Sequence, residues 1–432
     1  MMRVPIDPVV PLLRAVTRPL AGTPDLVALA DPSDPLLWLR GDRGCVGIGE
    51  TLRLTFTSPD RFTEAANTWR AIAKNAQIDD PVQMPGTGLV ALGTFAFADH
   101  SKVESVLIVP RILVAQHREA AWITEITEIT NSTHAAEASS HEAPAIPTPK
   151  PQNPWHATTF EAAPDTVTKY LEGVRKAAET IDKGKAEKIV LARQIAGTLA
   201  DDADLRTPLK RLADRYLDCW TFAVDGLIGA SPETLIRTTD GAVSARVLAG
   251  TRGRHPESDK RDAQARDELL TSAKEQHEHA FAVQSVVTAL SPHVNELRTS
   301  EAPFPLQLPN VWHLATDLGA TLKEQSSSLE LVDAIHPSAA IAGTPTATAV
   351  AAINKLEPFD RGRYSGAVGW IDADGDGEWV IALRCAQVEK AEGGQRRIIA
   401  SAGGGIVAGS DPEHELGETV SKFRPITEAF GD

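Results

Sequence analysis

Short apolar runs separated by turn residues mark the first part of the chain. Residues 106–109 and 112–114 are two such runs. Their length and β-branched composition predict strands. We therefore expect residues 1–130 to form the N-terminal part of a layered α/β body. No catalytic motif stands out in this part of the sequence.

The apolar pattern changes to a helical period after residue 160. Residues that recur every three or four positions predict one amphipathic helix. We expect Asp165 to cap its start and Gly184 to end it. The apolar positions are Val167, Leu171, Val174, Ala178 and Ile181.

Two later stretches read as strands that end in polar side chains. Residues 188–195 (KIVLARQI) form a β-branched run with Lys188 at its start, and residues 221–230 lead into Ser231-Pro232-Glu233. Such runs predict buried strands. Lys188 and Glu233 are then expected at strand ends, although a surface lysine and a turn glutamate are the ordinary alternatives for each residue taken alone.

Two helices are predicted further along the chain. One covers about residues 262–290 and ends at Ser291-Pro292, and the other begins with Asp411 at the N-cap and Pro412 in the first turn. The alternation of strand and helix signals, without a repeat of fixed period, favours an α/β or α+β layered fold. Residues 131–157, rich in Pro, Ala and Ser, are expected to be an exposed loop or linker. Residues 158–432 then form the catalytic region.

Charge and cysteine content narrow the functional classes. The net charge of −15 disfavours nucleic acid and anionic membrane surfaces as partners. An anionic small substrate would need local cations or a bound metal. Cys45, Cys219 and Cys385 show neither disulfide nor zinc spacing. The first twenty residues contain no apolar run of signal-peptide or membrane-spanning length, so we expect a cytoplasmic protein.

Two pairs of glutamates suggest a metal site. Glu275 and Glu278 are three residues apart on one predicted helix, and Glu415 and Glu418 repeat the spacing on the other. This spacing places each pair on one helix face. Carboxylate oxygens suit Mg²⁺, which usually keeps several waters. The alternative is that each pair belongs to a solvated helix face.

Two further features could bind an anion. Residues 401–407 (SAGGGIV) would let backbone N–H groups approach a ligand closely, or form only a flexible turn. Arg384 falls in a run that should be mostly buried. A buried arginine needs a carboxylate, which either a ligand or the protein could supply. His313 is more often structural when taken alone.

Six motifs occur in an order that resembles the chorismate-utilising enzymes. The resemblance covers about residues 160–430, and the stretch from His336 to Arg384 is similar to the isochorismate synthases. It implies two large antiparallel sheets stacked face to face, helices outside and a central active-site cleft. The motifs are KIVLAR at Lys188, ASPETL at Ala230, LAGTRGR at Leu248, SAKEQHEH at Ser272, VWHLAT at Val311 and AGGGIV at Ala402.

The resemblance also implies roles for individual residues. Lys188 corresponds to the general base that activates the water attacking C2 of chorismate, and Glu233 to the acid that protonates the departing C4 hydroxyl. Glu278 and Glu418 match direct Mg²⁺ ligands, while Glu275 and Glu415 match carboxylates that reach the metal directly or through water. The substrate-binding positions by resemblance are Gly250, Thr251, His313, Ala340, Ile341, Tyr364, Arg384, Gly403, Gly404 and Lys422.

The family divides at the pocket lining. Salicylate synthases share the same base, acid and metal ligands but also eliminate pyruvate, and they typically carry a threonine where Ala340 stands here. Ala340 followed by Ile341 therefore favours an isochorismate synthase. A salicylate synthase and a non-catalytic chorismate-binding protein are the alternatives. Gly404 departs from the family pattern, because alanine is common at that position.

These implications set the expected partners. We expect chorismate as substrate, Mg²⁺ as cofactor, a monomer, and no glutaminase subunit, because water rather than ammonia is added. The product could feed menaquinone or siderophore synthesis, since both routes share this step.

Overall fold

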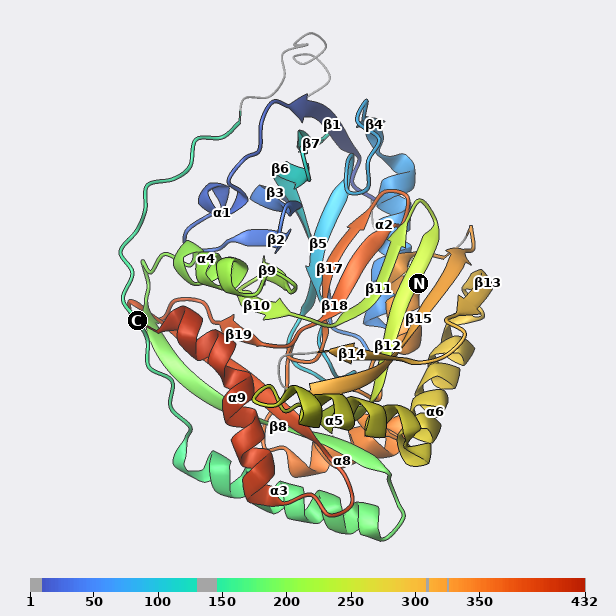
Figure 1. The fold of residues 1–432 in the computed structure, drawn as a ribbon. Helices are drawn as coiled ribbons and strands as arrows, with labels where there is room; N and C mark the ends of the chain where they lie inside the picture. The colour runs from blue at the N-terminus through green and yellow to red at the C-terminus, as the bar shows by residue number, and fades with distance from the viewer. Residues whose placement is uncertain (1–9, 130–145, 308–310, 325, 432) are drawn as a thin grey trace, which may run out of the picture.

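The strands belong to one hydrogen-bonded system that branches at β6 (Ser105–His117) (Figure 1). The computed structural model describes residues 10–129, 146–307, 311–324 and 326–431. Within these residues every strand pairing is antiparallel except that of β1 (Leu13–Leu20) with β4 (Gln77–Asp79). β7 (Ala120–Glu128) joins β1 to β6.

Two long arms extend from this branch. The first arm runs in the order β3 (Arg43–Phe56), β2 (Leu36–Arg40), β9 (Trp220–Val224), β10 (Leu227–Ser231), β19 (Cys385–Val388), β20 (Gln395–Ile406), β8 (Lys188–Ala200) and β16 (Gly343–Thr344). The second arm runs in the order β5 (Val90–Thr94), β17 (Ala367–Asp372), β18 (Gly377–Ile381), β11 (Thr234–Thr239), β12 (Ala242–Gly253) and β15 (Val311–Leu322), with β13 (Val294–Thr299) and β14 (Phe304–Gln307) both on β15.

The two arms pack face to face through alternate side chains. Trp38 and Phe222 of the first arm share one buried cluster with Leu92 and Val380 of the second. Strand neighbours such as Leu37 point the other way, into a separate cluster under the outer helices. This period-2 alternation is what two stacked sheets require. The expected fold class is therefore confirmed.

Helices cover the outer faces of both arms. On the first arm, α1 (Leu26–Leu29), α4 (Arg206–Arg215) and α9 (Pro412–Phe430) pack outside, and α3 (Pro164–Asp182) and α8 (Thr346–Leu356) lie against β8. On the second arm, α2 (Arg61–Asn75), α6 (Ala273–Leu290) and α7 (Ser328–Ile335) form one packed group, while α5 (Asp259–Thr271) contacts β12 and β15. Figure 1 shows α3, α8 and α9 gathered around β8.

The helix boundaries confirm some sequence predictions and correct others. Asp411 caps α9 by accepting from His414 N at 2.9 Å, and Pro412 is at N1. The predicted helix over 262–290 is instead two helices, because Ser272 takes an extended conformation and caps α6 through Glu275 N. Asp165 is not the N-cap of α3 but lies in its first turn, behind Pro164.

The predicted linker is described only in part. Residues 146–157 contain no helix or strand, and residues 130–145 lie outside the described part of the chain. No helix within the described ranges is long and apolar enough to cross a membrane.

Candidate active site

The site is built where β8 and β20 pair along their whole length. Lys188 is the first residue of β8, and its neighbour Ile189 pairs with Ile406 of β20. The side chain of Lys188 passes directly over Gly405, where an added Cβ would lie only 2.6 Å from Cε and 3.5 Å from Nζ. Glycine at 405 therefore provides the space that the lysine occupies.

Burial shifts the pKa of Lys188. The side chain is half-buried, and loss of hydration lowers the pKa of its ammonium group. The nearby Glu233 carboxylate opposes this change, and the positive charge of Lys422 adds to it. Within the described residues no carboxylate lies within ion-pair distance of Lys188. A lysine in this environment is neutral more often than an exposed one and can accept a proton.

Glu233 lies just beyond the end of β10 and is fixed by its backbone. Its N–H donates to Ser231 Oγ at 3.3 Å, and its carbonyl accepts from Ile381 N at 3.0 Å. Burial raises the pKa of the carboxyl group, while Lys188 and Arg384 act in the opposite direction. The two predicted catalytic groups thus share one electrostatic environment but have pKa values shifted toward each other. This is the arrangement that an acid–base pair needs.

The first glutamate pair extends from α6. Glu275 Oε2 would lie 3.2 Å from a Cβ on Gly250, which adopts a φ of +80° at the β-bulge of β12. Glu278 lies one turn further along, 45% exposed, and forms an ion pair with Lys274 at 3.7 Å. Because Ser272 caps α6, it fixes the start of the helix and so the positions of both glutamates on it.

The second pair extends from α9. Glu415 is only 7% exposed, and its Oε1 accepts from Ser410 Oγ at 2.8 Å. Its Oε2 is buried without a hydrogen-bond partner among the described residues. Burial raises the pKa of this carboxyl group. Glu418 forms an ion pair with Lys422, whose Nζ also donates to the Gly403 carbonyl at 2.7 Å.

These carboxylates fit a divalent cation only in part. Hard carboxylate oxygens suit Mg²⁺, and the unpartnered Oε2 of Glu415 is the kind of atom that a cation would satisfy. Glu278 and Glu418, from different helices, both act on the pKa of Lys188. However, the described residues contain no group of three or more acidic, histidine or cysteine side chains close enough to hold one ion. Convergence of all four glutamates on one metal stays a prediction.

Arg384 brings a second cation to the same place. It lies between β18 and β19 with a φ of +48°, and burial lowers the pKa of its guanidinium. Tyr364, Glu233 and Glu418 counteract this shift, which places all three near it. Tyr364 itself is buried, which raises the pKa of its phenol to about 12. No ion pair of Arg384 is found in the described part of the chain, so a ligand carboxylate could pair with it.

The remaining predicted side chains that the structure describes are those of His313, Ala340 and Ile341. His313 Nδ1 lies 3.3 Å from the Gly250 carbonyl, and burial lowers the pKa of the imidazole. Ala340 is half-buried and Ile341 is buried, in the turn between α7 and β16. The side chain of Thr251 is not among those that the structure describes.

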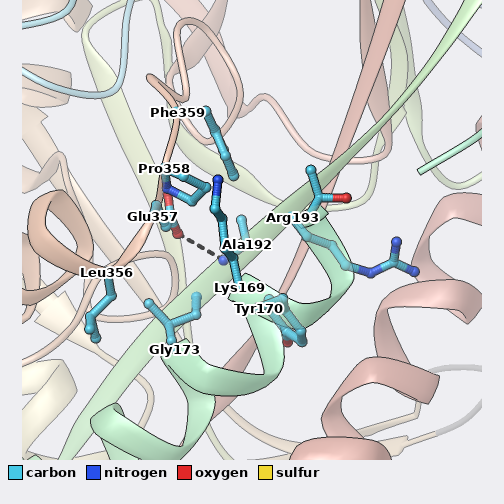
Figure 2. A pocket seen from close by; sticks show the side chains of 11 residues that line it. Lys169, Tyr170, Gly173, Ala192, Arg193, Leu356, Glu357, Pro358 and Phe359 are labelled. Carbon is cyan, nitrogen blue, oxygen red and sulfur yellow. Dashed lines mark hydrogen bonds between the residues drawn. The ribbon is translucent and has the colours of Figure 1, made fainter. Parts of the chain in front are cut away.

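The segment that contains Ala340 is held by an arginine that the sequence analysis did not identify. Arg361 is buried and donates to the Ile341 carbonyl at 2.9 Å and the Val190 carbonyl at 2.8 Å. Glu357 accepts from Arg361 at 2.6 and 2.9 Å and from Ala192 N at 2.8 Å, the bond drawn in Figure 2. This buried pair joins the pocket segment to β8. Its only sequence signal was that Arg361 lies in the stretch from His336 to Arg384 that is similar to the isochorismate synthases.

Comparisons with known proteins agree with this geometry. Residues 34–431 match the family model described as chorismate binding enzyme. Isochorismate synthase DhbC of Bacillus subtilis (strain 168) is 38% identical over 296 residues, which are 65% of this chain and 72% of the relative.

Two solved structures share the fold over nearly the whole chain. The 2,3-dihydroxybenzoate-specific isochorismate synthase of Bacillus anthracis, itself described as putative, has a TM-score of 0.70 and 31% identity and covers 94% of this chain and 98% of its own. The menaquinone-specific isochorismate synthase MenF of Escherichia coli has a TM-score of 0.76 and 25% identity and covers 98% of this chain and 95% of its own.

The burial of Lys188 leads to a prediction about its titration. We expect its pKa in the folded protein to lie below its pKa in the urea-unfolded chain, measured by pH-dependent competitive acetylation and mass spectrometry. Because the unfolded chain then binds this proton more tightly, the free energy of unfolding should rise with pH between the two pKa values. Glu233→Gln should lower the folded pKa further, since it removes the opposing carboxylate.

Glu179→Gln, at an exposed position of α3, is the matched control and should leave the titration of Lys188 unchanged. A folded pKa equal to or above that of the unfolded chain would contradict the assigned environment.

Proposed function

Because this chain belongs to the chorismate-binding enzyme family, we propose that it is an isochorismate synthase that interconverts chorismate and isochorismate. The observation that carries this proposal is the pair of Lys188 and Glu233, whose pKa values are displaced in opposite directions by burial at one place. The names of the relatives support the same activity.

The reaction needs one base and one acid. Neutral Lys188 takes a proton from a water molecule while the oxygen of that water bonds to C2 of chorismate. The ring double bonds shift, the C4–O bond breaks, and Glu233 gives its proton to the departing hydroxyl, which leaves as water. One water enters and one leaves, so the net change is an isomerisation. The lowered pKa of the lysine favours its neutral form and the raised pKa of the glutamate favours its protonated form, which are the starting states that this reaction requires.

Cations position the two carboxylates of the substrate. Arg384, buried and near Tyr364, is suited to bind the enolpyruvyl carboxylate, because a guanidinium binds a carboxylate through two parallel hydrogen bonds. Mg²⁺ held by Glu275, Glu278, Glu415 and Glu418 would supply the positive charge for the ring carboxylate. Without such charges, a protein with a net charge of −15 would repel the dianionic substrate.

The pocket lining favours this reaction over pyruvate elimination. Ala340 and Ile341 provide only apolar side chains, on a segment fixed to β8 by Arg361. The added nucleophile is water from solvent, so the proposal requires no glutaminase subunit, and a monomer suffices. Salicylate synthase is the second candidate, because it would use the same base and acid.

Incubation with chorismate tests the proposed activity. With Mg²⁺, the wild-type protein should form an equilibrium mixture of chorismate and isochorismate without pyruvate, followed by NMR. Lys188→Ala should reduce the rate by about 100-fold or more, since a general base contributes roughly 10² to 10⁴ in rate. Lys183→Ala, an exposed lysine at the end of α3, is the control that should stay active.

The products separate the candidates. Salicylate with pyruvate from the wild type would identify the second candidate instead. No turnover would indicate a non-catalytic chorismate-binding protein.

The metal assignment predicts a changed magnesium dependence. Glu278→Gln should raise the Mg²⁺ concentration for half-maximal rate by about tenfold or more, because it replaces a charged ligand with a neutral amide. The measurement is a magnesium titration of the initial rate, with Glu179→Gln as the exposed control. A titration identical to that of the wild type would remove Glu278 from the metal site.

The pocket argument predicts a change of product. Ala340→Thr should make pyruvate and salicylate appear, because it introduces the hydroxyl typical of salicylate synthases into a half-buried position. Ala340→Val is the matched control, because valine has nearly the same shape as threonine but no hydroxyl. The product ratio is measured by chromatography. Equal ratios from the two variants would show that the hydroxyl does not determine the outcome.

A further inference from the structure

Tyr170 is a buried polar residue without an assigned role. It lies on α3, is only 4% exposed, and packs in the core cluster beside β8. Figure 2 shows it next to Ala192 and Arg193. Its hydroxyl has no hydrogen-bond partner among the described residues. A buried hydroxyl without a partner costs stability, and phenylalanine would pack as well, so its presence needs an explanation.

A second unpartnered atom lies near the hydroxyl. A Cβ on Gly404 would lie 3.8 Å from the Tyr170 hydroxyl and 3.0 Å from Glu415 Oε2. Glu415 Oε2 is also buried and without a hydrogen-bond donor in the described structure. Glu418 Oε1 lies 3.6 Å from the same Cβ position, but it already forms an ion pair with Lys422. The Tyr170 hydroxyl and Glu415 Oε2 are thus a donor and an unpartnered acceptor beside one glycine, which has no side chain between them.

The phenol is suited to donate. An ordinary tyrosine hydroxyl has a pKa of about 10. The group therefore keeps its proton at neutral pH. A protonated phenol beside a carboxylate forms a strong, charge-assisted hydrogen bond.

The helix that carries Glu415 is fixed from the same side. Arg193 of β8 extends toward α9 (Figure 2), and its Nε donates to Thr419 Oγ1 at 2.6 Å. Its guanidinium also lies 4.8 Å from the ring centroid of Phe423. These contacts set the rotation of α9, but neither touches the Glu415 carboxylate. Ser410 donates to Oε1 of that carboxylate, and Oε2 can accept from a second donor.

We propose that Tyr170 is a positioning residue whose hydroxyl donates to Glu415 and orients its carboxylate toward the metal in the acidic site. This inference rests on the proposed function, which assigns Glu415 to Mg²⁺. Tyr170 acts through Glu415 and touches neither substrate nor metal. Groups that orient metal ligands typically change metal affinity by roughly 10- to 100-fold when removed.

Metal binding to the substrate-free protein provides the test. Mn²⁺, added alone and followed by the loss of its free EPR signal, replaces Mg²⁺ as the probe. Tyr170→Phe should weaken Mn²⁺ binding by about 10-fold. Its metal-free midpoint of thermal unfolding should stay close to that of the wild type, because phenylalanine fills the same space in the core cluster.

Tyr216→Phe is the matched control. It makes the same chemical change at the end of α4, near Glu428 at the far end of α9, and should leave Mn²⁺ binding unchanged. In a Glu415→Gln background the effect of Tyr170→Phe should become smaller, since the two residues act together.

The outcomes separate this proposal from the metal assignment. Wild-type binding of Mn²⁺ that Tyr170→Phe leaves unaltered would overturn the role of Tyr170 alone. Equal losses from Tyr170→Phe in both backgrounds would also overturn it, because the tyrosine would then act independently of Glu415. Failure of the wild type to bind Mn²⁺ would overturn the metal site and, with it, the role of Tyr170.

Discussion

The close approach of β20 to β8 is the constraint on which the site depends. Lys188 reaches its position only because residue 405 has no side chain, and Glu415 approaches the strand only because residue 404 has none. Each Cβ would lie 2.6 to 3.0 Å from an atom of these side chains. The same strand then leads, after one turn, into α9, so a single pairing aligns the base with one acidic helix.

Shared burial shifts the pKa values of two neighbouring groups in opposite directions. Loss of hydration penalises whichever form is charged, so it lowers the pKa of a lysine and raises that of a glutamate. Lys188 and Glu233 would cancel both shifts if they formed a close ion pair, and the described structure contains no such pair. Their separation therefore preserves a base and an acid that can act together, with Arg384 and Lys422 moderating the field at Glu233.

Local sequence patterns predicted where Lys188 and Asp411 lie in their elements, but not how the candidate site residues are arranged. Strand-end polar residues such as Lys188, and the N-cap at Asp411, follow from local patterns, and the structure places them accordingly. The break at Ser272 escaped detection because helical periodicity continues on both sides of it. Tyr170 and Arg361 were missed because each acts through long-range contacts, with α9 and with the Ile341 segment, that no local pattern encodes.

The two acidic helices belong to different arms of the sheet. α6 packs on β12 of the second arm, and α9 packs on β20 of the first. Their carboxylates are like charges, so the arms do not gain from approaching each other at this point unless positive charge lies between them. Lys422, which forms an ion pair with Glu418, supplies part of that charge from the first arm. A divalent ion would supply the rest, and it would also give a partner to Oε2 of Glu415, which is buried without one in the described structure.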